Sequence, residues 1–140
     1  MGTIGITILA AALGLTAVAQ AGEVASALEV ATKTYRSKGY SPAGWEQMGR
    51  LANAADTRLV LPLKGGHSYQ IVAVCERKCT DLDLQLFDAA GKEVDWDAQD
   101  DNFPIVATYA QATQDYTLRV AMSACGQTQC AFGVKAFVKN

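Results

Sequence analysis

From residue 56 to the end of the chain, apolar and polar positions alternate with a period of two in six or seven short runs. Turn-forming residues such as Gly65-Gly66 separate the runs. The apolar members are Leu59, Leu61 and Leu63; Tyr69, Ile71, Ala73 and Cys75; Leu82, Leu84 and Leu86; Ile105, Ala107 and Tyr109; Tyr116, Leu118, Val120 and Met122; and Phe132, Val134, Ala136 and Val138. Strands that bury one side and expose the other usually pair antiparallel. The pattern predicts an all-β domain over residues 56–140, an antiparallel, jelly-roll-like β-sandwich.

The segment before these runs has a helical period. Four apolar residues fall on one stripe of a helix over residues 23–40, namely Val24, Leu28, Ala31 and Tyr35. Gly39 and Pro42 mark its end. We expect residues 22–55 to form a helical N-terminal arm, with a further turn over residues 44–51. The arm either packs on the sandwich or moves freely.

The first residues have the pattern of an export signal. Residues 4–19 are apolar or small, and Ala19 and Ala21 form the Ala-x-Ala motif that signal peptidase recognises. No Lys or Arg precedes the apolar run, and the alternative is a membrane anchor, for which the run is short. We expect residues 1–21 to be a cleaved signal peptide. The remaining 119 residues would form one small secreted or periplasmic protein without stable membrane insertion.

The four cysteines lie in two closely spaced pairs, Cys75/Cys79 and Cys125/Cys130. Each pair brackets the connection between two expected strands, so local pairing needs the least rearrangement of the three possible pairings. Closing such short loops stabilises a protein by about 2 kcal/mol each on the chain-entropy estimate. The spacing also fits a four-cysteine zinc site or a redox site. An oxidising compartment favours two local disulfides.

Negative charge is concentrated in one segment, although the net charge is only −2 and argues against a nucleic-acid partner. Residues 81–101 contain eight carboxylates and one Lys. Extracellular modules bind calcium through convergent carboxylates. Residues 95–106 begin like an EF-hand loop, but Asp100 occupies the glycine position and Val106 the glutamate position. A looser calcium site has as candidate ligands Asp81, Asp83, Asp95, Asp97, Asp100 and Asp101; the alternative is a solvated acidic loop.

Trp96 lies between two of these aspartates. It either binds a ligand, by stacking on a sugar ring, or folds back to anchor its own loop. Catalysis has little support, because His67 is the only histidine and no Gly-x-Ser-x-Gly motif is present. A glycosidase pair among the carboxylates would need a separation that the sequence does not give. We expect no enzyme.

Three motifs resemble those of the bacterial pre-peptidase C-terminal (PPC) domains over residues 59–138. They are Gly66-x-x-Tyr69 before a strand, the Asp-Leu-Asp-Leu run from Asp81 with Gly91 after it, and the Tyr-Thr-x-x-Val run from Tyr116. Gln114 replaces the glycine that precedes the last motif, and the paired cysteines are not part of the general family pattern. The resemblance implies a secreted β-sandwich, and some family members bind calcium or matrix polymers.

These features predict a non-catalytic binding module for an envelope or extracellular polymer or protein, with calcium ordering the acidic loop. The first alternative is a structural or interaction subunit that acts through its helical arm and binds no small ligand. The second alternative is a small hydrolase that uses the acidic loop.

Overall fold

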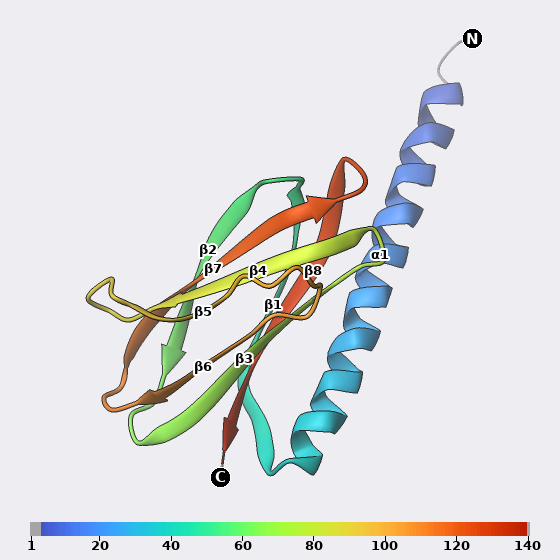
Figure 1. The fold of residues 1–140 in the computed structure, drawn as a ribbon. Helices are drawn as coiled ribbons and strands as arrows, with labels where there is room; N and C mark the ends of the chain where they lie inside the picture. The colour runs from blue at the N-terminus through green and yellow to red at the C-terminus, as the bar shows by residue number, and fades with distance from the viewer. Residues whose placement is uncertain (1–3, 140) are drawn as a thin grey trace.

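The computed structural model describes the backbone of residues 4–139 and the side chains of residues 17–139. In this part of the chain, one helix precedes eight strands (Figure 1). The elements are α1 (Ile4–Ser37), β1 (Tyr40–Ala52), β2 (Asp56–Leu63), β3 (His67–Cys75), β4 (Cys79–Phe87), β5 (Glu93–Asp97), β6 (Ile105–Ala110), β7 (Gln114–Cys125) and β8 (Gln129–Lys139). Two antiparallel sheets result, with the strand orders β1-β8-β3-β6 and β2-β7-β4-β5.

The hydrophobic core lies between the inner faces of the two sheets. Successive side chains of a strand point to opposite faces, so the period-two apolar positions of β2, β3, β4, β7 and β8 face this layer. Leu84, Leu118 and Val120 are fully buried there, together with Ile71 and Val134 from the first sheet. The predicted β-sandwich is therefore confirmed, and so is the inward direction of these leucines and of Val120.

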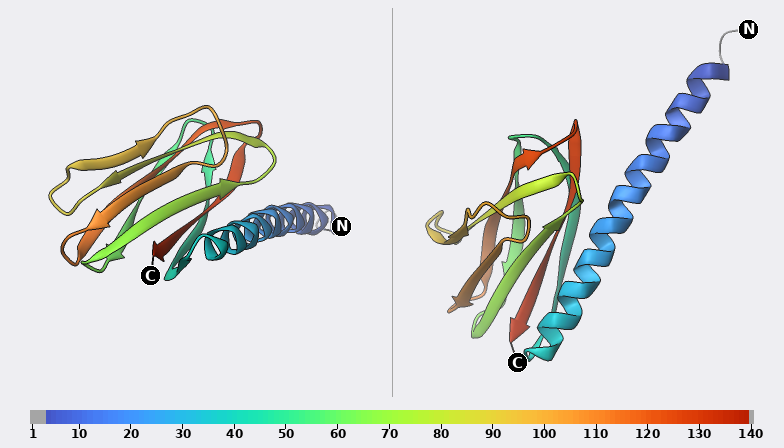
Figure 2. Two further views of the ribbon diagram at one scale, coloured as in Figure 1. Left: turned by 60° about the horizontal axis from the view of Figure 1, so that its bottom comes forward. Right: turned by 45° about the vertical axis from the view of Figure 1, so that its right-hand side comes forward.

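Helix α1 packs on the outer face of the first sheet, and its N-terminal part extends beyond the strands (Figure 2). The predicted stripe is buried against β3 and β8, because Val24, Leu28, Ala31 and Tyr35 are each at most 4 % exposed. Tyr35 stacks on Phe137 with ring centroids 4.5 Å apart. Gly133 allows the close approach, since a Cβ there would lie 2.7 Å from Val24 Cγ1. Packing of the arm on the sandwich is confirmed.

Only the first part of the expected N-terminal arm, residues 22–55, is helical. Gly39 has a φ of 88°, a left-handed conformation that commonly ends helices, and α1 stops at Ser37. Residues 44–51 form no helical turn, because β1 occupies Tyr40–Ala52 and pairs with β8 along most of its length. The register shifts between Pro42 and Glu46, which interrupts the period of two that would have indicated a strand.

The expected leader and the expected arm form one continuous helix from Ile4 onward, and residues 1–3 lie outside the described residues. Within the described part of the chain, no helix has both the length and the apolar character needed to cross a membrane.

Strand β6 exists where the sequence predicts a strand, but the residues predicted to face the core point outward. Val106 and Ala110 are buried in the core, whereas Ile105, Ala107 and Tyr109 are exposed. Both faces of this short strand carry apolar side chains, so periodicity alone does not tell which of them is buried. The outward direction gives this edge of the sandwich an apolar surface.

Candidate functional site

Two aspartates of the acidic segment cover the free edge of β6. Strand β5 runs beside β6, and the backbone N–H of Ala107 donates to Asp95 Oδ2 at 2.7 Å. The N–H of Ile105 donates to Asp97 Oδ2 at 3.0 Å. Both N–H groups point away from β3, so the two carboxylates satisfy an edge that could otherwise pair with another chain.

The other carboxylate oxygens organise the connection between β5 and β6. Asp95 Oδ1 accepts a hydrogen bond from the N–H of Trp96 at 2.9 Å, and Asp97 Oδ1 accepts one from Gln99 at 3.2 Å. Asp101 Oδ1 accepts one from the N–H of Phe103 at 3.0 Å. These side chains therefore have a structural role in the acidic segment, which the sequence pattern does not reveal.

Asp81 and Asp83 lie next to each other on the outward side of β4. Ser123 donates to Asp83 Oδ2 at 2.6 Å, whereas the buried Oδ1 atoms of both aspartates have no partner elsewhere in the described structure. Burial, the charge of Asp83 and a hydrogen bond to it, and the charges of Asp100 and Asp101 raise the pKa of Asp81 to about 6. Asp81 can donate the hydrogen bond to Asp83 only while its carboxyl group is protonated, which is why this bond raises the pKa.

The six candidate calcium ligands therefore separate into two sets. Asp95 and Asp97 bind backbone N–H groups, while Asp81 and Asp83 share an environment with Asp100 and Asp101. Among the described residues, no three His, Cys, Asp or Glu side chains form a group that could hold a metal ion. The residues present do not form a ready calcium site, and calcium binding stays a prediction from the sequence.

Exposed large apolar side chains are concentrated in β5, β6 and their connection. Five of the nine large apolar side chains that are exposed in the described part of the chain lie within residues 94–109. We call four of them the β5–β6 rim: Trp96, Phe103, Ile105 and Tyr109. Trp96 is 63 % and Tyr109 is 59 % exposed, and Trp96 and Ile105 line a shared hollow of about 450 Å³. Because Trp96 is largely exposed, it does not fold back as an anchor of its own loop.

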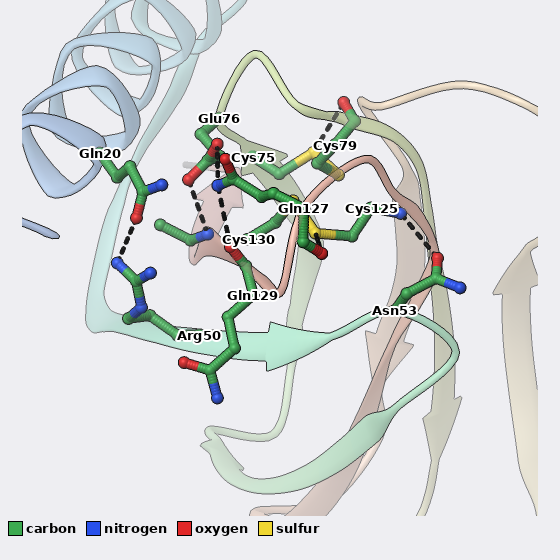
Figure 3. The surroundings of a disulfide bond; sticks show 11 residues. Gln20, Arg50, Asn53, Cys75, Glu76, Cys79, Cys125, Gln127, Gln129 and Cys130 are labelled. Carbon is green, nitrogen blue, oxygen red and sulfur yellow. Dashed lines mark hydrogen bonds between the residues drawn. A yellow bond between two sulfur atoms is a disulfide. The ribbon is translucent and has the colours of Figure 1, made fainter. Parts of the chain in front are cut away.

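The two expected disulfides are present, Cys75–Cys79 and Cys125–Cys130, and the described residues contain no free cysteine (Figure 3). The pairing leaves no cysteine for zinc. Cys79 lies directly opposite Cys125 in the β4–β7 ladder, so the two disulfides are neighbours.

Sequence reasoning missed the buried carboxylate that joins these two loops. Glu76 is 2 % exposed; its carboxylate accepts hydrogen bonds from Gln127 Nε2 at 2.8 Å and from the N–H of Ala131 at 3.2 Å (Figure 3). Gln127 also donates to the carbonyl of Gln129. Within the sequence, Glu76 is one of three charged residues of a short connection, which gives no signal of burial. Its role here is structural.

No protein-family model and no curated protein matches this chain. Solved structures that share its fold include the following two. The first is PliG of Aeromonas hydrophila, a periplasmic lysozyme inhibitor of g-type lysozyme, with a TM-score of 0.51 and 12 % identity; the match covers 68 % of this chain and 85 % of PliG. The second is the pre-peptidase C-terminal domain of a Bacillus anthracis collagenase, with a TM-score of 0.53 and 9 % identity; it covers 66 % of this chain and 87 % of that domain.

The similarity to the collagenase domain confirms the PPC resemblance at the level of the fold. At these identities the similarity extends to the sandwich and not to individual residues.

Proposed function

We propose that this protein is a non-catalytic binding module of the periplasm or the extracellular space, which binds a protein partner through the β5–β6 rim. The observation that carries the proposal is that Trp96, Phe103, Ile105 and Tyr109 are all exposed and belong to two neighbouring edge strands and their connection. Exposed apolar patches of this kind mark interaction sites, and large aromatic residues dominate the binding energy of protein interfaces.

The chemistry of the rim favours a protein over a sugar polymer. A sugar site needs polar groups that converge beside the stacking ring, but the carboxylates of Asp95 and Asp97 are already bonded to backbone N–H groups. Ile105 and Phe103 add apolar area that hydroxyl-rich sugars do not complement. The stripe of α1 is buried against the first sheet, which disfavours binding through that stripe.

Two findings support the compartment. Both disulfides belong to an environment that keeps cysteines oxidised. PliG, which has the same fold, is described as a periplasmic lysozyme inhibitor and thus as a protein that acts on another protein. The expected export signal over residues 1–21 agrees with the same location.

Site-directed photo-crosslinking in cells that make the protein tests this proposal. A benzophenone side chain at Ile105 lies on the rim, and one at Val60 lies on β2 at the other edge of the sandwich and is the matched control. We expect one discrete protein adduct from position 105 and none from position 60. Equal adducts from both positions, or none from either, would contradict the proposal. If the wild type were retained on a polysaccharide resin and Trp96→Ala were not, the partner would be a sugar polymer and not a protein.

A further inference from the structure

A second concave surface lies between α1 and the first sheet, and it shares Phe103 and Ile105 with the β5–β6 rim. It is a groove of about 450 Å³. One wall comes from α1, including Val30 and Lys38; the base includes Val74 of β3, and the opposite wall includes Phe103 and Ile105. Its volume lies within the range of small-molecule sites, and like those sites it is mainly apolar with few polar groups.

The charged lining of the groove is only positive. Lys38 is the only charged residue among those that line it, and no carboxylate does so, although the protein carries a net charge of −2. Among the described residues Lys38 has no ion-pair partner; its Nζ lies 5.7 Å from the centroid of the Tyr35 ring. The phenol of Tyr35 is bonded to Gln70, so the ammonium of Lys38 is the group available for a ligand.

The apolar part of the groove is open to a ligand. Val30 lines the groove from α1 and is 65 % exposed, because it lies outside the buried stripe of the helix. Phe103 and Ile105 are also exposed and face the groove from the other side. An apolar chain placed between these walls would remove surface from water on both sides, at roughly 25 cal/mol per Å².

We propose that this groove binds a free single-chain anionic amphiphile, a fatty acid, with its carboxylate at Lys38 and its chain between Val30 and Phe103. One cation at the end of an apolar groove matches one carboxylate on one apolar chain. All lining residues lie within residues 27–105, so the site is present whether or not residues 1–21 are removed.

Calorimetric titration with three twelve-carbon compounds tests the proposal, each used below the concentration at which it forms micelles. The oxidised protein should bind dodecanoate, bind uncharged dodecanol at least about tenfold more weakly, and not bind dodecyltrimethylammonium. Lys38→Gln should reduce the affinity for dodecanoate to that for dodecanol. Equal binding of all three compounds, or no binding of dodecanoate, would overturn the assignment.

A matched pair of surface variants locates the site. Val30→Asp places a carboxylate in the groove and should weaken dodecanoate binding at least about tenfold. Val60→Asp makes the same change on β2, at a similar exposure of 63 %, and should leave binding unchanged. Equal losses in the two variants would show that binding lies elsewhere. Ile105, the crosslinking position, lines both surfaces, whereas Val30 and Lys38 lie outside the β5–β6 rim. Variants at Val30 and Lys38 therefore test the groove separately from the rim.

Discussion

At the scale of single residues, Asp95 and Asp97 each use both carboxylate oxygens to accept backbone hydrogen bonds. The sequence predicts where the carboxylates are concentrated but not what they bind, because the N–H of Ala107 is twelve residues away from Asp95 along the chain. Only the adjacency of β5 and β6, which is a property of the whole fold, brings them together.

Asp97→Asn should therefore destabilise the protein. The amide keeps one acceptor oxygen in place of two, so one of the backbone N–H groups at Ile105 and Gln99 loses its partner. We expect a loss of about 1–2 kcal/mol in the free energy of unfolding, measured by denaturant titration. Asp115→Asn, at an exposed site on β7, is the control and should change stability by no more than about 0.5 kcal/mol. Equal stability of the two variants would contradict the role of Asp97.

Asp81 should make stability depend on pH. Its folded-state pKa of about 6 is raised above the ordinary value near 4, so between these values the folded state holds a proton that the unfolded state has lost. The stabilisation is complete below pH 4 and is lost as the pH rises through 6. Asp81→Asn should be more stable than the wild type at pH 7.5, by roughly 1–2 kcal/mol after allowance for solvent screening, and nearly equal at pH 4. A pH-independent difference would argue against the raised pKa of Asp81.

The same variant tests the calcium hypothesis. Calcium at Asp81 and its neighbours would raise the melting temperature of the wild type in a millimolar titration, and Asp81→Asn would reduce the rise. An unchanged melting temperature would contradict calcium binding at these aspartates.

At the scale of elements, the sequence predicts the buried stripe of α1 correctly because four residues on one helical face need only local periodicity. It does not predict β1, whose strand conformation depends on pairing with β8, 77 to 99 residues away along the chain. The register shift near Pro42 and Glu46 removes the local signal. The need for glycine at position 133 likewise cannot be predicted from the sequence, because it arises only when α1 packs over this residue.

Gly133→Ala should weaken the docking of α1. The new Cβ would lie 2.7 Å from Val24 Cγ1 and 2.9 Å from Leu28 Cδ1, so helix and sheet must separate slightly. We expect a loss of about 1–3 kcal/mol in thermal or chemical unfolding, as for other overpacked sites. Gly22→Ala on α1 has no atom within 4 Å of its Cβ and should be neutral or slightly stabilising. A stable Gly133→Ala variant would mean that the helix does not pack as described.

The β4–β7 ladder predicts an alternative disulfide. Cys79 and Cys125 are directly opposite, and the hydrogen bond from Gly126 N to Lys78 O, at 2.8 Å, identifies them as a non-hydrogen-bonded pair. Such pairs have a Cα separation near 4.5 Å, within the range of disulfides. The double variant Cys75→Ser and Cys130→Ser should therefore form a Cys79–Cys125 link in air, seen by non-reducing peptide mapping. Two persistent free thiols would contradict this register.

At the scale of the whole molecule, the sandwich is predictable because many short runs repeat one alternation, and an error in a single strand does not change the fold class. The candidate site is not predictable in the same way. The rim combines residues of β5, β6 and their connection, and it exists because Ile105 and Tyr109 face outward. Trp96 could be singled out from the sequence, but its apolar neighbours could not.

The affinity of the protein partner for rim variants tests the central claim most directly. Calorimetric titration would compare the wild type, Trp96→Ala and the control Val60→Ala, whose side chains are equally exposed at 63 %. Truncation of an aromatic residue at the centre of an interface costs about 2 kcal/mol or more, so Trp96→Ala should weaken binding at least about thirtyfold. Val60→Ala should bind like the wild type. Equal affinities for all three proteins would contradict binding through the β5–β6 rim.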